Sequence, residues 1–122
     1  MNNPEVTMHE KQQSNRFDAL EKATTAAGIA ISLVMRVPAP LKPIADQVIR
    51  SASSVPANLA EGAGRSGRDR MHFWRIAYGS AKEVDTHLRL LVGAGAINAS
   101  RTETSLQIFD DVRAMTWRLL HP

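Results

Sequence analysis

The sequence predicts a single all-α domain, an antiparallel up-down-up-down four-helix bundle with a proline-kinked second helix. Alanine is abundant and aromatic residues make up only 5% of the 122 residues, a composition that favours helices over sheets. No run of β-branched residues alternates with polar ones. Four segments carry apolar residues at steps of three and four, and short turns rich in proline or glycine separate them.

Composition also narrows the class of protein. The chain has no cysteine, which excludes disulfides and thiolate metal sites and fits a reducing, cytoplasmic compartment. No apolar run approaches the roughly 18 residues that span a membrane, and the first residues lack the apolar core of a signal peptide. The net charge of +3 is compatible with an anionic partner but does not require one.

The first helix is predicted over residues 15–37. Residues 1–14 are polar and lack periodicity, so we expect a disordered tail, with the bundle domain occupying residues 15–122. Ser14 or Asn15 can cap the helix, and the prolines at 38 and 40 end it. Its predicted inner face consists of Phe17, Leu20, Thr24, Ala27, Ile31 and Val34.

The second helix is predicted to start near residues 41–43, where proline is tolerated, and to reach the glycine-rich turn at 62–67. Beside its apolar stripe runs a polar one, formed by Gln47, Ser51, Ser54, Asn58 and Glu61. Pro56 leaves the carbonyl of Ala52 without its donor, which predicts a kink. A helix break at Ser54 is the alternative.

The third helix is predicted over 68–92, with Ser66 and Asp69 approximating a capping box. Gly79 in its middle predicts the close approach of a neighbouring backbone. The predicted buried face consists of Phe73, Ile76, Ala77, Ser80, Val84, Leu88 and Leu91.

The fourth helix is predicted over 101–120, where Ser100 and Glu103 match a capping box. Its apolar residues repeat almost as a heptad: Leu106, Phe109, Val112, Met115 and Leu119. Ile108, Trp117 and Leu120 fall off that stripe, which indicates either a broad buried face or a second contact between subunits.

The turn at 62–67 (GAGRSG) matches the G-x-G-x-x-G pattern of dinucleotide-binding sites. That pattern needs a strand before it, and here a helix precedes it. A P-loop is also disfavoured, because Arg68 and Asp69 replace its lysine and its hydroxyl residue. We therefore interpret these glycines as a flexible turn between helices.

Arginines cluster around this turn. Arg65, Arg68, Arg70 and Arg75 lie near the predicted start of the third helix, with His72 and a single acid, Asp69. Arginines beside the open amides of a helix N-terminus bind phosphate, and such contacts hold nucleic acid without reading its sequence. We predict these four arginines as a nucleic-acid-binding set, with a solvated basic face as the alternative.

The carboxylates indicate no metal site and no reaction centre. Glu61, Glu83 and His87 could suggest a metal, but a di-iron bundle needs Glu-x-x-His motifs, and the chain has none. We predict no metal, no cofactor and no enzyme. Asn58 and Glu61, if they face inward, need partners, for which Arg50, Arg75, Tyr78, Ser80 and the turn amides are candidates. We expect this polar set to fix the register of the second helix against the third.

Three blocks carry a resemblance to a known family: residues 47–52 (QVIRSA), 54–62 (SVPANLAEG) and 76–83 (IAYGSAKE). They resemble the four-helix-bundle proteins encoded in 23S rRNA intervening sequences, over about residues 16–120. That bacterial family is related to the accessory variability determinant of diversity-generating retroelements. The resemblance places the family pattern on Gln47, Arg50, Ser54, Pro56, Asn58, Glu61, Gly62, Gly79, Ser80 and Glu83. Its polar members, with Pro56 as the kink, are interpreted as a structural polar core.

The resemblance implies a ring-shaped assembly, commonly a homopentamer, and its retroelement relatives bind nucleic acid and a reverse transcriptase. Two hypotheses follow for this chain. One is a non-enzymatic, ring-forming adaptor that contacts the phosphate backbone of RNA or DNA through the four arginines. The other is a structural oligomer that scaffolds a protein partner through the fourth helix or Trp117, without binding nucleic acid. Neither hypothesis involves a membrane.

Overall fold

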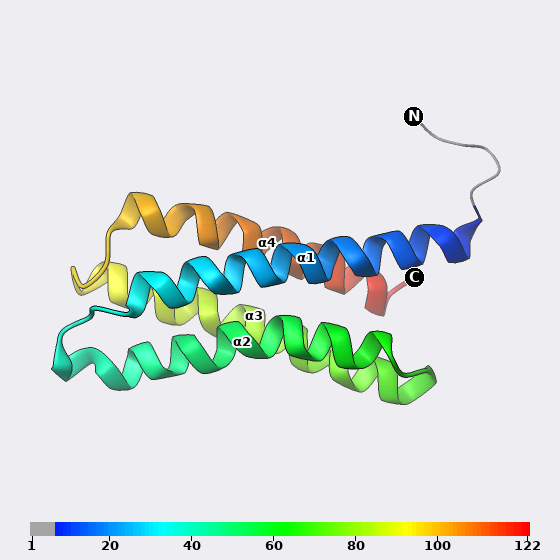
Figure 1. Ribbon diagram of the computed structural model, residues 1–122, viewed down its shortest axis with the longest axis horizontal. Helices are drawn as coiled ribbons and strands as arrows, with labels where there is room; N and C mark the ends of the chain where they lie inside the picture. Colours follow the sequence, from blue (N-terminus) through cyan, green and yellow to red (C-terminus); the bar gives the residue numbers. More distant parts are fainter. Residues whose placement is uncertain (1–6) are drawn as a thin grey trace.

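A computed structural model describes residues 7–122, and within this range it contains helices and no strand. This described part of the chain forms four long α-helices. Figure 1 shows them side by side, with successive helices running in opposite directions along the long axis. The all-α four-helix fold is therefore confirmed. α1 and α3 each pack against both α2 and α4. The helices are α1 (Met8–Val34), α2 (Lys42–Ala63), α3 (Gly67–Gly93) and α4 (Ala99–Leu120), with a short 3-10 turn, η1 (Ala39–Leu41), before α2.

The start of α1 corrects the prediction of a disordered tail. Thr7 Oγ1 accepts a hydrogen bond from the Glu10 amide at 3.1 Å, and Glu10 Oε2 accepts one from the Thr7 amide at 3.3 Å. This reciprocal capping box satisfies amides that a helix start leaves without acceptors, so α1 begins at Met8 rather than at Asn15. The prediction is wrong for residues 8–14, and residues 1–6 lie outside the described residues.

The buried face of α1 also differs from the prediction. Phe17 is 65% exposed, and Leu20 and Ile31 are only half-buried. Small side chains let α1 come close to its neighbours, because the distance between helix axes depends on the side chains at the contact. The face that is buried is mostly alanine: Ala19, Ala23, Ala26, Ala27, Ala30 and Val34.

α2 is continuous from Lys42 to Ala63 with Pro56 inside it, so the alternative of a break at Ser54 is wrong. The kink expected at Pro56 stays a prediction. α2 starts directly after the short turn η1, at the position predicted from the prolines. α2 therefore brings its whole C-terminal half, with Leu59 and Gly62 buried, against α3.

Three predictions about α3 are wrong: its cap, the close approach at Gly79 and part of its buried face. Ser66 makes no side-chain cap, and a Cβ added to Gly79 would meet nothing within 4 Å, so no backbone approaches there. Phe73 is half-buried and Ile76 is exposed. The buried face is shifted from the one expected and consists of Trp74, Ala77, Ala81, Val84, Leu88 and Leu91.

α4 is capped by Asn98, whose Oδ1 accepts from the Arg101 amide at 3.0 Å, and not by Ser100 as predicted. Its buried residues repeat as an unbroken heptad stripe, half of which carries hydroxyl groups. Ser105 Oγ donates across the bundle to the Ala26 carbonyl of α1 at 3.1 Å, so a buried hydroxyl links α4 to α1. The stripe consists of Thr102, Ser105, Phe109, Val112, Thr116 and Leu119.

Candidate nucleic-acid interface at the basic end

Basic side chains gather at one end of the bundle. Figure 1 shows that the start of α1, the end of α4 and the turn between α2 and α3 lie at the same end. We call this the basic end, because its cations outnumber its acids, which are Glu10, Glu61 and Asp69. The cations are Lys11, Arg16, Arg65, Arg68, Arg70, Arg75 and Arg118.

Trp74 anchors the basic end. Its indole is 2% exposed, and Nε1 donates to the Leu59 carbonyl of α2 at 3.3 Å. Gly62 leaves the space that the ring needs, because a Cβ there would lie 2.5 Å from Trp74 Cδ1. Trp74 was not among the predicted site residues. The signal was present, since Trp74 begins the three- and four-residue spacing that Ala77 and Ala81 continue.

Arg70 is held by the backbone at the end of α2. Its Nε donates to the Gly62 carbonyl at 3.2 Å and its Nη2 to the Ala63 carbonyl at 3.5 Å. These carbonyls belong to the last turn of a helix, which lacks donors of its own and carries partial negative charge. The guanidinium also lies 5.5 Å from the centre of the Trp74 ring. Arg70 therefore has a structural role besides any contact with a ligand.

Arg65 forms an ion pair with Glu61, whereas Arg68 and Arg75 form none within the described chain. Its Nη2 lies 2.7 Å from Glu61 Oε1, and its guanidinium lies 4.9 Å from the Phe73 ring centre. The hydrogen bond to Glu61, followed by that carboxylate's charge, raises the pKa of Arg65. Arg68 and Arg75 are exposed, and no carboxylate in residues 7–122 forms an ion pair with either. These two arginines are therefore the least neutralised of the predicted set.

The first turn of α3 adds donors to this surface. The first amides of any α-helix have no acceptor within the helix. Ser66 occupies the N-cap position without a side-chain hydrogen bond, and Gly67 and Arg68 are exposed. Open amides, the positive end of the helix dipole and Arg68 thus lie together, which is a combination that favours phosphate oxygens.

Only some residues of the predicted polar core form a hydrogen-bond network. Ser54 Oγ and Ser80 Oγ lie 2.9 Å apart, and Asn58 Nδ2 donates to the Ser54 carbonyl at 2.8 Å and to Ser54 Oγ at 2.9 Å. This network joins α2 to α3. The other expected members are exposed and form no part of this network. They are Gln47, Arg50, Glu61 and Glu83.

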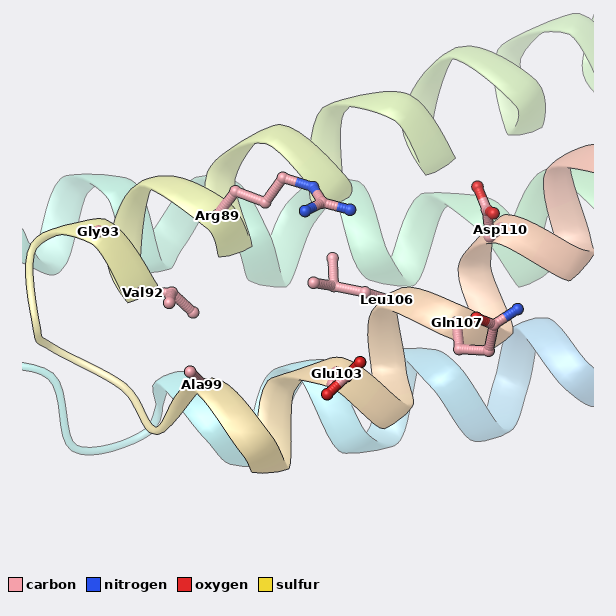
Figure 2. A pocket seen from close by; sticks show the side chains of 8 residues that line it. All are labelled: Arg89, Val92, Gly93, Ala99, Glu103, Leu106, Gln107 and Asp110. Carbon is pink, nitrogen blue, oxygen red and sulfur yellow. The ribbon is translucent and has the colours of Figure 1, made fainter.

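A separate groove of about 480 Å³ lies at the opposite end, between the end of α3 and the start of α4. Figure 2 shows Arg89 extending above Leu106, with Glu103 and Asp110 on the α4 side. Arg89 Nε pairs with Asp85 Oδ1 at 2.8 Å. The groove-lining residues include no serine or histidine that could form a nucleophile–base pair, so we derive no reaction from it.

Among residues 7–122, no group of three or more His, Cys, Asp or Glu side chains could hold a metal ion. No helix in this described part of the chain is long and apolar enough to cross a membrane.

Comparisons with known proteins agree with the fold. A family model described as 23S rRNA-intervening sequence protein matches residues 16–118. A crystal structure of a protein of unknown function from the S23 ribosomal protein family of Bacteroides thetaiotaomicron is similar, with a TM-score of 0.80 and 20% sequence identity. The match covers 88% of this chain and 99% of that one, and at this identity it supports the fold alone. The comparison with curated proteins found no match.

Proposed function

The chain belongs to the 23S rRNA-intervening sequence protein family, and from this premise we propose that it is a non-enzymatic, ring-forming adaptor that binds the phosphate backbone of RNA or DNA through the basic end. The observation that carries the proposal is the pair Arg68 and Arg75. Both are exposed, and no carboxylate of residues 7–122 neutralises them. An unneutralised arginine binds phosphate by charge-assisted hydrogen bonds, often two at once.

The four predicted arginines contribute unequally in this proposal. Arg68 lies beside the open amides of α3, and together they form one phosphate contact. Arg75 lies two helical turns further along α3 and supplies a second. Arg65 contributes less, because Glu61 already balances its charge. Arg70 supports the surface by holding the end of α2.

Charge reversal tests the proposal. The double variant R68E/R75E should abolish the mobility shift of short RNA and DNA oligonucleotides of unrelated sequence, because both contacts become repulsive. The matched control R36E/R101E makes the same charge change at exposed positions far from the basic end and should bind as the wild type does. The proposal is refuted if both double variants lose oligonucleotide binding equally, or if neither loses it.

A second candidate function is supported by Trp117. This side chain is 50% exposed and its ring stacks on His121 with the centroids 4.2 Å apart. Exposed tryptophans are enriched at protein–protein interfaces, where they bury much area at low entropic cost. In this alternative the chain is a structural oligomer that scaffolds a protein partner, such as a reverse transcriptase, and binds no nucleic acid.

Light scattering separates the two candidates. If the alternative holds, Trp117→Ala lowers the oligomer mass or the capture of a protein partner, while R68E/R75E changes neither. If Trp117→Ala leaves both measurements at their wild-type values, the α4 contact is eliminated.

A further inference from the structure

A second arginine from a distant part of the chain faces the anchoring tryptophan. The guanidinium carbons of Arg16 in α1 and Arg70 in α3 lie 5.4 and 5.5 Å from the centre of the Trp74 ring. Both arginines line a cleft of about 70 Å³, together with Gln12, Met71 and Leu119. Drug-sized ligands occupy pockets of about 300–1,000 Å³, so this cleft has room for a group of only a few atoms.

No acidic side chain of the described residues lines this cleft, whose remaining lining residues are Trp74 and Pro122. No carboxylate of residues 7–122 lies within ion-pair distance of Arg16 or Arg70. Arg70 donates Nε and Nη2 to carbonyls of α2, and its Nη1 forms no hydrogen bond within the described chain. Two guanidiniums that share one indole without an acid between them repel each other.

Arg16 is the more informative of the two. Its Nε is shielded from solvent and has no hydrogen-bond partner among residues 7–122. Buried donors in folded proteins are nearly always satisfied, so an unsatisfied one indicates a missing partner. Burial, and then the charge of Arg70, lower the pKa of Arg16, so the site as it stands disfavours the charge that Arg16 carries.

We propose that this cleft binds a single phosphate-type oxyanion between Arg16 and Arg70, above Trp74. Such a ligand supplies the negative charge and the acceptors that the two guanidiniums lack, and Gln12 adds a neutral donor at the rim. The site is distinct from the Arg68–Arg75 surface, since neither of those arginines lines the cleft. It does not depend on nucleic-acid binding. A free phosphate and the terminal phosphate of an oligonucleotide present the same group.

Isothermal titration of the full chain with inorganic phosphate, at constant ionic strength set with chloride, tests the site. The wild type should bind, and Arg16→Gln should raise the Kd at least about tenfold, because a hydrogen bond to a charged group is lost. Arg36→Gln, a neutralisation at an exposed position far from the basic end, should leave the Kd unchanged. Comparing a 5′-phosphorylated oligonucleotide with its 5′-hydroxyl form then distinguishes the terminal from the free source.

Thermal unfolding gives a second readout. Phosphate should raise the Tm of the wild type but not of Arg16→Gln, and in phosphate-free buffer Arg16→Gln should unfold at a higher temperature than the wild type. Arg16→Lys keeps a cation in the same fold and should bind with intermediate affinity, which separates loss of the site from loss of folding.

The proposal is overturned if the wild type does not bind phosphate, or if Arg16→Gln and Arg36→Gln weaken binding equally. These outcomes differ from a failure of the nucleic-acid proposal. The nucleic-acid proposal is refuted if R68E/R75E keeps its oligonucleotide affinity. Even then, the cleft is established as a phosphate site if saturable phosphate binding is lost only in Arg16→Gln.

Discussion

Arg89 at one end of the bundle and Arg16 at the other differ in how their charge is balanced. At the α3–α4 end, Arg89 pairs with Asp85 and lies in a groove that also contains Glu103 and Asp110 (Figure 2). At the basic end, Arg65 in the turn before α3 pairs with a carboxylate, whereas Arg16 and the arginines of α3 at this end have no carboxylate partner in the described residues. A cation that is already balanced gains little from an added anion. The difference favours the basic end as the binding surface that we propose.

The largest expected effect concerns the anchor of that surface. Trp74→Ala should lower the free energy of unfolding by about 3–5 kcal/mol, because it removes a buried aromatic side chain and leaves a cavity. Trp117→Ala, which changes the same residue type at a half-exposed position, should cost about 1 kcal/mol or less. Urea denaturation measures both. Similar losses in the two variants would mean that Trp74 does not anchor the basic end.

The next largest effects on stability are expected from substitutions of two glycines, one at the basic end and one in the middle of α3. Gly62→Ala places a Cβ 2.5 Å from Trp74 Cδ1 and should destabilise the chain by about 1–3 kcal/mol. Gly79→Ala has open space around it in the middle of α3 and should stabilise the chain by about 0.8–1.0 kcal/mol. Opposite shifts in Tm are expected. Two shifts of the same sign would contradict the close approach at Gly62.

The polar network between α2 and α3 should have a smaller effect. A double-mutant cycle of Ser54→Ala and Ser80→Ala should give a coupling energy of about 0.5–1.5 kcal/mol, since the two hydroxyl oxygens lie 2.9 Å apart. Ser53→Ala, on the exposed side of α2, is the control partner in a parallel cycle with Ser80→Ala. Coupling of the same size in both cycles would show that the direct contact is not its source.

The smallest effect is expected at the opposite end. Arg89→Gln removes an exposed ion pair with Asp85 and should change stability by about 0.5 kcal/mol or less. Oligonucleotide and phosphate affinities should stay at wild-type values. A loss of either affinity would place a binding surface at the α3–α4 groove instead.

Much of the fold was predictable, because prolines and glycines mark the ends of the helices. The start of α2 after the proline turn and the turn at 62–67 were predicted, whereas the start of α1 was not. Its capping box, Thr7 with Glu10, is hidden in a polar stretch that has no apolar periodicity. The sequence alone therefore understated the length of α1.

The buried faces were harder to predict, because bulky residues indicated the wrong face of the helix. Phe17 and Phe73 were assigned to the core, but the buried seams contain alanine, serine and threonine beside Trp74. The arginines of α3 were found as a local cluster. Arg16 was not, because only the tertiary arrangement of the helices brings it to the same indole.

The salt dependence of oligonucleotide binding tests the central claim, that the basic end binds phosphate, most directly. For single strands, the slope of log K against log salt changes by about 0.7 for each phosphate contact. We predict a shallower slope and weaker binding for Arg68→Gln and Arg75→Gln, and a wild-type slope for Arg36→Gln. Equal slopes in all four proteins would contradict the account.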